Sequence, residues 1–271
     1  MQTEHAEAPG AFEQALRVLQ SGDLSQKVTE TQVLRHNWSK RPVLGHPPDS
    51  IPLSPKRPQA PTLVSPSDVP RRRLGSVEGR RALLHAVAHI EFNAIDLAVD
   101  MIARFGNNPL LPEAMRPEFV GDWIKVADDE ARHFSLIRAR LQSLGVDYGH
   151  FPAHNGLWEA AIATHANFAA RLAIAPMVLE ARGLDVTPGM INKLNKVGDR
   201  ESSAILTIIY EDEIGHVATG AKWFHRITKL MGETSQTFFK SLVEEYFKGQ
   251  LKPPFNHAAR TLAGVPETYY T

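Results

Sequence analysis

Two Glu-x-x-His pairs are the residues of this 271-residue chain whose types and spacing could perform metal chemistry. The first pair is Glu130 with His133, and the second is Glu213 with His216. Residues three apart share one face of a helix, so a carboxylate and an imidazole placed this way can ligate neighbouring ions. From 18 Glu and 12 His, roughly 0.8 such pairs are expected by chance, so the pairs gain weight only from where they lie on their helices.

The residues that surround the two pairs have the 3.6-residue period of a buried helix face. One such stripe is Val126, Glu130, His133, Phe134, Ile137 and Leu141, and another is Ile205, Ile209, Glu213, His216, Gly220 and Trp223. Two more stripes contain one acidic residue each. They are Leu84, Ala88, Glu91, Ile95, Ala98 and Ile102, and Ala166, Ala169, Ala173, Met177 and Glu180. Each of four helices therefore buries a carboxylate, and alternate helices add a histidine.

Four buried carboxylates predict a pair of bound cations. Ionised carboxylates are costly to bury without partners, and two histidines cannot neutralise four negative charges, whereas two divalent ions can. The chain has no cysteine, so thiolate ligands and disulfides are excluded, and the oxygen and nitrogen donors suit iron, with manganese as the alternative. Buried ion pairs without metal are the competing interpretation.

Four long segments with apolar helical periodicity must position these side chains, and they predict an all-α four-helix bundle. The predicted helices cover residues 77–105, 117–144, 156–182 and 188–231. Gly183 closes the third helix, Pro176 kinks it, and Gly198 marks a break in the fourth.

The ends of the chain differ from this bundle. A short amphipathic helix is predicted over 11–21, and a proline-rich arm over 42–70, either disordered or laid on the surface. Residues 237–247 predict a further helix, and the tail from Lys252 is predicted to be irregular. The expected organisation is an N-terminal helix and arm in 1–74, packed on a bundle with a C-terminal extension in 75–271.

Composition gives no support to several classes of function. Thirty basic residues balance 30 acidic ones, so no excess of positive charge indicates nucleic-acid binding. The longest uninterrupted apolar stretch, 172–179, is too short to cross a membrane, and the first ten residues do not resemble a secretory signal. We therefore expect a soluble, cytoplasmic protein.

Several stretches resemble the DUF455 family of the ferritin-like superfamily. They are "HIEFNAIDLAVDM" (89–101), "DDEARHF" (128–134), "RLAIAPMVLEARGLDVTP" (171–188), "YEDEIGHV" (210–217) and "LKPPFNHAARTLAG" (251–264). The resemblance implies a ferritin-like four-helix bundle with a metal site at Glu91, Glu130, His133, Glu180, Glu213 and His216. It implies no particular reaction.

The metal site leads to three functional hypotheses. The first is a di-metal oxidoreductase or oxygenase that activates O2 or peroxide on a small organic substrate, as a monomer or small homo-oligomer with an electron-donor protein. The second is a non-catalytic protein for metal storage or detoxification, and the third is a helical interaction module. Tyr210, Asp212, Asp129 and Glu211 flank the predicted ligands and could hydrogen-bond them.

Overall fold

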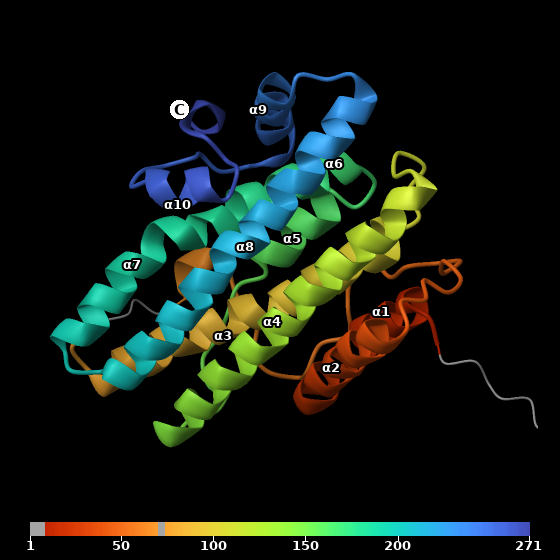
Figure 1. Ribbon diagram of the computed structural model, residues 1–271. Coiled ribbons are helices and arrows are strands. Elements are labelled where there is room, and N and C mark those ends of the chain that lie inside the picture. Colours follow the sequence, from red (N-terminus) through yellow and green to blue (C-terminus); the bar gives the residue numbers. More distant parts are fainter. Residues whose placement is uncertain (1–8, 70–73) are drawn as a thin grey trace, which may run out of the picture.

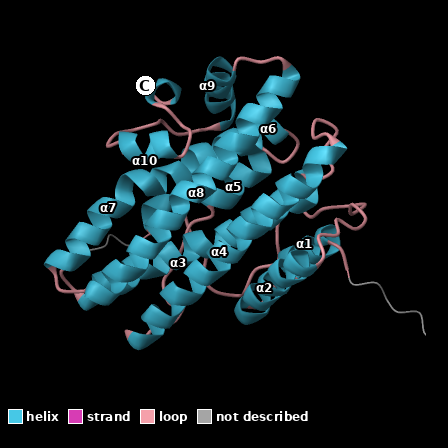
Figure 2. Cartoon of the chain, in the orientation of Figure 1, coloured by secondary structure: helices cyan, strands magenta, loops and turns pink. Residues whose placement is uncertain are grey.

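The computed structural model describes residues 9–69 and 74–271, whose regular structure is helical, as the sequence predicts (Figures 1 and 2). The helices are α1 (Ala11–Gln20), α2 (Leu24–Lys40), α3 (Val77–Asp100), α4 (Arg116–Ser143), α5 (Gly156–Ala163), α6 (Phe168–Ile174), α7 (Ala181–Lys196), α8 (Arg200–Met231), α9 (Ser235–Tyr246) and α10 (His257–Leu262). Residues 1–8, which belong to the segment where no secretory signal is expected, lie outside the described residues. Pro70, at the end of the predicted arm, also lies outside them.

Four long helical segments form the core of the molecule. Helix α3 packs against α4, and α7 packs against α8, while α4 and α8 also touch. Figure 1 shows α1 and α2 beside α4, α9 near the C-terminal end of α8, and α10 beside the start of α7. Val77–Phe105 is long and apolar enough to cross a membrane, but 89% of its apolar window is buried inside the protein. This burial is consistent with the core helix of a soluble protein.

A widened helical turn follows α6 at the position where the sequence predicts a kink. Residues Ala175–Glu180 are π-helical and connect α6 to α7. Pro176 has no N–H to donate to the preceding turn, which favours such a local rearrangement. Gly220 of α8 makes room for it, because a Cβ at Gly220 would lie 2.3 Å from Cγ of Pro176. Glu180, the last residue of the turn, is thereby carried toward α8.

The predicted boundary between the third and fourth core helices is wrong. Helix α7 continues through Gly183 and Pro188 to Lys196, and the chain breaks only at 197–199. Pro188 cannot donate to the carbonyl of Leu184, but Nδ2 of Asn256 donates to it instead, at 3.1 Å. The break that Gly198 predicts is confirmed, with Gly198 at φ +78°.

The predicted third helix starts at Gly156 as expected, but its predicted continuity is wrong, because residues 156–182 do not form one helix. Helix α5 ends at Ala163, and Asn167 caps α6 by accepting from the N–H of Ala170 at 3.0 Å. The buried Arg171 donates to the carbonyl of Ala161 at 2.5 Å, which satisfies the end of α5. Ala166, predicted to face inward, is exposed in the turn between the two helices.

Helix α2 is absent from the sequence prediction. Its buried residues are Lys27, Thr31 and Leu34, so its inward face is mostly polar and shows no apolar period. The proline-rich segment that follows contacts other parts of the chain as far as Val64. Trp158 donates to the carbonyl of Leu53 at 2.9 Å, and Leu63 forms an isolated parallel bridge with Ala153. Through these two contacts the segment lies against α5 and the loop before it.

At the C-terminal end, α9 confirms the helix predicted over 237–247, with bounds Ser235–Tyr246. The tail beyond it is more regular than predicted, because α10 and a 3-10 turn at Glu267–Tyr269 form within it. Arg260 anchors α10 through two hydrogen bonds to Asp185 of α7, at 2.8 and 2.7 Å. A buried ion pair with α7 therefore orders a segment whose sequence has few apolar residues at helical spacing.

Candidate metal centre

The six predicted ligands come from four helical segments. Glu91 lies on α3, Glu130 and His133 on α4, Glu180 at the end of the π-helical turn, and Glu213 and His216 on α8. Ligand atoms of Glu91, Glu130, His133 and Glu213 all lie within 4.8 Å of one another, so this group could hold a metal ion. Glu180 and His216 lie outside that group of four, but both interact electrostatically with its members.

Glu130 occupies the middle of the cluster, between the two imidazoles. Its Oε2 lies 3.5 Å from Nδ1 of His133, and its Oε1 lies 3.0 Å from Nδ1 of His216. His133 Nδ1 also lies 3.1 Å from Glu91 Oε2, while His216 Nδ1 lies 3.7 Å from Glu213 Oε2. Each histidine therefore faces Glu130 and one further carboxylate, so the cluster consists of two similar halves that share Glu130.

The far nitrogen of each histidine is held by an aspartate from the opposite helix. Nε2 of His133 on α4 lies 3.0 Å from Asp212 on α8, and Nε2 of His216 on α8 lies 3.3 Å from Asp129 on α4. Arg132 joins the two aspartates, at 2.5 Å from Asp212 and 3.6 Å from Asp129. A carboxylate that accepts from Nε2–H leaves Nδ1 unprotonated toward the centre, which is the state a metal ligand requires.

Several buried polar atoms of the cluster have no hydrogen-bond partner among the described residues. They are Oε1 and Oε2 of Glu130, Oε2 of Glu180, Oε2 of Glu213 and Nδ1 of His216. Buried acceptors without partners are costly and therefore rare in folded proteins. Their convergence fits a site in which cations complete the coordination, and oxygen and nitrogen donors of this kind suit iron or manganese.

The pKa shifts of the cluster residues in the metal-free protein agree with a site that binds cations. Burial raises the pKa of Glu91, Glu180 and Glu213, and repulsion from neighbouring carboxylates raises it further. Burial would lower the pKa of His133, but the nearby carboxylates of Glu130 and Glu91 outweigh this and raise it to about 11. Burial thus favours the protonated forms of the three glutamates, and a metal ion must displace such protons in order to bind.

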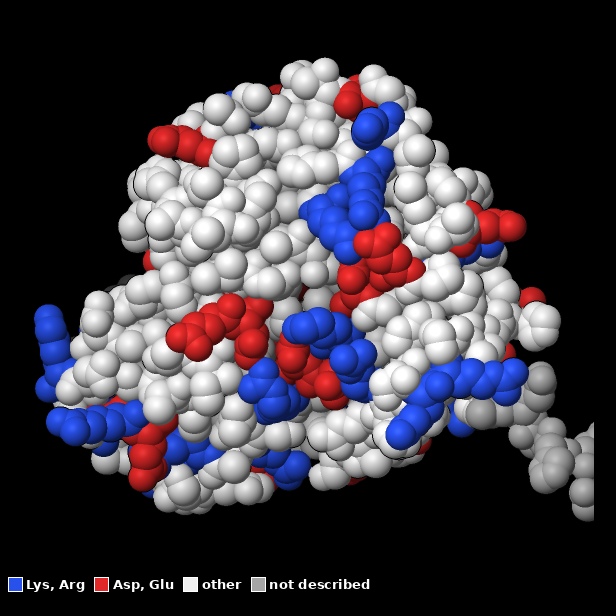
Figure 3. Space-filling model, in the orientation of Figure 1, with Lys and Arg blue, Asp and Glu red and all other residues white. Residues whose placement is uncertain are grey.

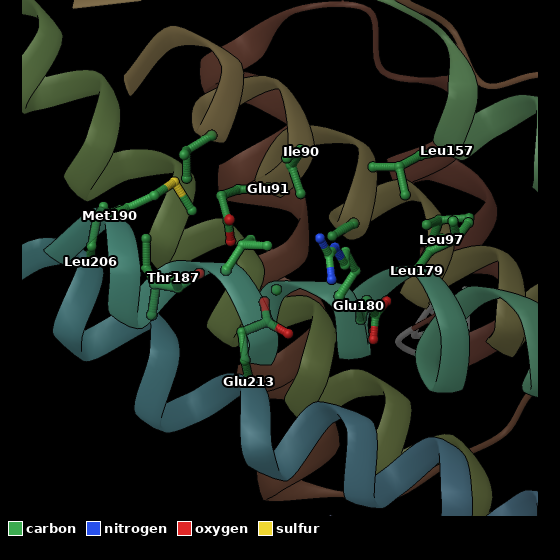
Figure 4. Close-up of a pocket in the computed structure, with 16 residues that line it drawn as sticks. Ile90, Glu91, Leu97, Leu157, Leu179, Glu180, Thr187, Met190, Leu206 and Glu213 are labelled. Carbon is green, nitrogen blue, oxygen red and sulfur yellow. The ribbon is translucent and has the colours of Figure 1, made fainter. Parts of the chain in front are cut away.

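A cavity of about 170 Å³ lies against one side of the cluster. Glu91, Glu180 and Glu213 contribute to its wall, and most of the remaining wall is apolar. Figure 4 shows the carboxylates of Glu91 and Glu213 between two apolar groups. Leu206 and Met190 lie to the left of this view, and Leu97, Leu157 and Leu179 lie to the right. Three of the predicted ligands are thus accessible from a space that can hold a small molecule.

The residues that flank the ligands differ in where they point. Asp212 and Asp129 reach the histidines, whereas Glu211 is exposed on the outer side of α8. Tyr210 bonds to Nδ2 of Asn256 at 2.9 Å and, among the described residues, to none of the ligands. The sequence contained a signal for the two aspartates, because each motif is Asp-Glu-x-x-His, at 129–133 and 212–216.

Charged side chains cover the seam between α4 and α8 outside the cluster. Lys125 donates to Asp129 at 2.6 Å, and further along the seam Lys222 lies 2.8 Å from Glu118. Figure 3 shows basic and acidic side chains interleaved across the middle of this face. The bonds from His216 and Lys125 lower the pKa of Asp129 against the opposing effect of burial. Asp129 therefore stays ionised and can orient His216.

Replacing Asp212 with asparagine is expected to weaken metal binding about 10- to 100-fold, because the amide removes the charge that orients His133. Competition with a chromophoric chelator measures this affinity. Glu211→Gln is the matched control, since it removes a neighbouring charge that is exposed. An Asp212→Asn variant that keeps wild-type affinity, or a Glu211→Gln variant with an equal loss, would contradict the role assigned to Asp212.

Comparison with known proteins identifies the family. The chain is 45% identical over 210 residues to an uncharacterised protein of Haemophilus influenzae, an alignment that covers 78% of this chain and 73% of the relative. No solved structure matches the chain. Residues 20–271 match DUF455, described as "Protein of unknown function". The chain therefore belongs to the DUF455 family.

Proposed function

We propose that this protein is a ferritin-like di-metal carboxylate oxidoreductase that uses O2 or peroxide to oxidise a small organic substrate. The observation that supports this most is the paired site, in which Glu130 lies between two histidines and a cavity reaches three further carboxylates. Helix bundles with a carboxylate on each helix and Glu-x-x-His on two of them are characteristic of di-iron and di-manganese proteins.

The residues fall into distinct roles in this proposal. Glu130, which lies between the two histidines, would contribute to both metal positions; His133 with Glu91 would hold one ion, and His216 with Glu213 and Glu180 would hold the other. Bound iron or manganese would supply the redox chemistry that activates O2 or peroxide. Asp212 and Asp129 fix the imidazole orientation, and the apolar cavity wall excludes water from the reacting groups.

Storage or detoxification of metal is the alternative function. A storage protein needs many copies in a closed shell, and it has no need for an apolar cavity beside its metal site. The cavity against Glu91, Glu180 and Glu213 therefore favours a substrate. The balanced charge of the chain likewise favours a small molecule over a nucleic acid. For chemistry with O2, we infer an electron-donor protein as a partner.

Elemental analysis of protein purified from its own host without chelators tests the proposal. About two iron ions per chain would support it, and about two manganese ions would favour peroxide as the oxidant. Oxygen uptake after anaerobic loading with ferrous ion then tests for redox chemistry. Absence of metal would reject both the enzyme and the storage function, and full metal without oxygen or peroxide consumption would reject the enzyme.

A further inference from the structure

The cavity beside the metal centre sets limits on the size and polarity of a ligand. Apart from the three carboxylates of the cluster, the polar side chains in its wall are those of Arg182 and Thr187, among the described residues. An engineered apolar cavity of about 150 Å³ binds benzene, so a volume of about 170 Å³ suits an apolar body of roughly six to nine non-hydrogen atoms.

Gly183 indicates where such a molecule enters. It lies in the first turn of α7, which continues the π-helical turn without a break, and it lines the cavity, although glycine destabilises continuous helix relative to alanine. A Cβ at Gly183 would meet no atom within 4 Å, so close packing does not require glycine here. The missing side chain instead leaves free space in the cavity wall.

Arg182 lies next to this gap, and only part of its guanidinium group takes part in hydrogen bonds. Its Nη1 donates to the carbonyls of Lys252 and Pro254, at 2.8 and 3.0 Å. The carboxylate nearest to it, that of Asp185 at 3.5 Å, already accepts two bonds from Arg260. Within residues 9–69 and 74–271, Nε and Nη2 of Arg182 have no hydrogen-bond partner, and no ion pair joins Arg182 to the glutamates of the cluster.

The exposure of Arg182 places it between the cavity and the solvent. Its side chain is 43% exposed and still contributes to the cavity wall. A guanidinium offers two parallel N–H donors that match a carboxylate. A cation at the mouth and an apolar interior together fit a molecule with one anionic end.

We propose that the cavity binds a small carboxylic acid with an apolar body, whose carboxylate is held by Nε and Nη2 of Arg182. Its hydrocarbon part enters past Gly183 and lies against the apolar wall near Glu91 and Glu213. This inference rests on the proposed function, because it names the substrate class of the same centre. Arg182 selects the anionic end, and Gly183 keeps the entry open.

Calorimetric titration with hexanoate and with 1-hexanol tests the proposal on zinc-loaded protein, in which the metal is redox-silent. Wild-type protein is expected to bind hexanoate more tightly than hexanol. Arg182→Met should weaken hexanoate about tenfold or more and leave hexanol within about twofold. Gly183→Leu should abolish binding of both probes by filling the entry, and the control Gly183→Ala should retain both.

Three results would overturn the proposal. Unchanged hexanoate binding in Arg182→Met would mean that the carboxylate binds elsewhere, for example on the metal ions. Retained binding in Gly183→Leu would mean that the probes do not occupy this cavity. Failure of wild-type protein to bind either probe would remove the site altogether.

Metal analysis of the same samples, and titrations repeated on metal-free protein, separate this proposal from the proposed function. If the protein takes up no metal but binds hexanoate in a manner that depends on Arg182 and Gly183, only the di-metal function is rejected. If the metal content is full and neither probe binds, only the ligand assignment is rejected.

Discussion

Glu130→Gln is expected to reduce the metal content from about two ions per chain to near zero, with a loss of affinity greater than about 100-fold. Glu130 is the carboxylate that lies within 3.5 Å of both imidazoles. Glutamine preserves the volume of the side chain but lacks the charge, so the bridging position loses its ability to neutralise two cations. Elemental analysis after loading with ferrous or manganous ion measures the effect.

Two controls separate loss of ligation from loss of folding in this variant. Glu211→Gln, which is exposed on α8, should keep the full metal content. Circular dichroism of metal-free Glu130→Gln should show the helical signal of the parent. If the folded Glu130→Gln variant still bound two ions per chain, Glu130 would not be the bridging ligand, and the arrangement of the proposed centre would be wrong.

Lys27→Met is expected to lower the free energy of unfolding by about 3 kcal/mol, because it breaks a buried ion pair by removing one partner. Lys27 and Asp96 are fully buried and hydrogen-bonded to each other, and they join α2 to α3. Burial lowers the pKa of Lys27 and raises the pKa of Asp96, so each charge depends on the other. Arg57, 3.4 Å from Asp96, compensates only in part. Urea denaturation measures the change.

A double variant and an exposed ion pair serve as the controls for Lys27. Adding Asp96→Asn to Lys27→Met should recover part of the loss, because no unpaired buried charge then remains. Glu113→Gln removes the charge of a side chain that is 89% exposed and paired with Arg116, and should cost less than about 1 kcal/mol. A Lys27→Met loss no larger than that of Glu113→Gln would show that the buried pair does not hold α2 on the core.

Helix identity was predictable wherever an apolar face repeats every 3.6 residues. Residues 77–105 and 117–144 match α3 with its π-helical end and α4 within a few positions. This succeeds because burial of one helix face is a local pattern. The same reasoning missed α2, whose inward face carries Lys27 and Thr31. These residues are buried only because Asp96 and the backbone offer them partners, and such partners leave no periodic signal.

Helix boundaries depended on contacts that are distant in sequence. Pro188 and Gly183 normally end a helix, and from local rules alone α7 should have stopped before them. The side chain of Asn256, about 70 positions away, donates to the carbonyl that Pro188 leaves free, and the helix therefore continues. Conversely, Asn167 and Arg171 separate α5 from α6 within a segment whose alanines suggested one helix.

The sequence by itself predicted which residues would form the candidate metal centre, and the structure brings four of them within 4.8 Å of one another. Helical spacing alone puts a carboxylate on the inner face of four helices, and it puts each histidine one turn from its glutamate. Only the tertiary structure decided that Asp212 orients His133 across the bundle, that Glu211 faces solvent, and that a cavity reaches Glu180. The physical reason is that a helix fixes the direction of its own side chains, whereas hydrogen-bond partners and empty space arise only where separate helices meet.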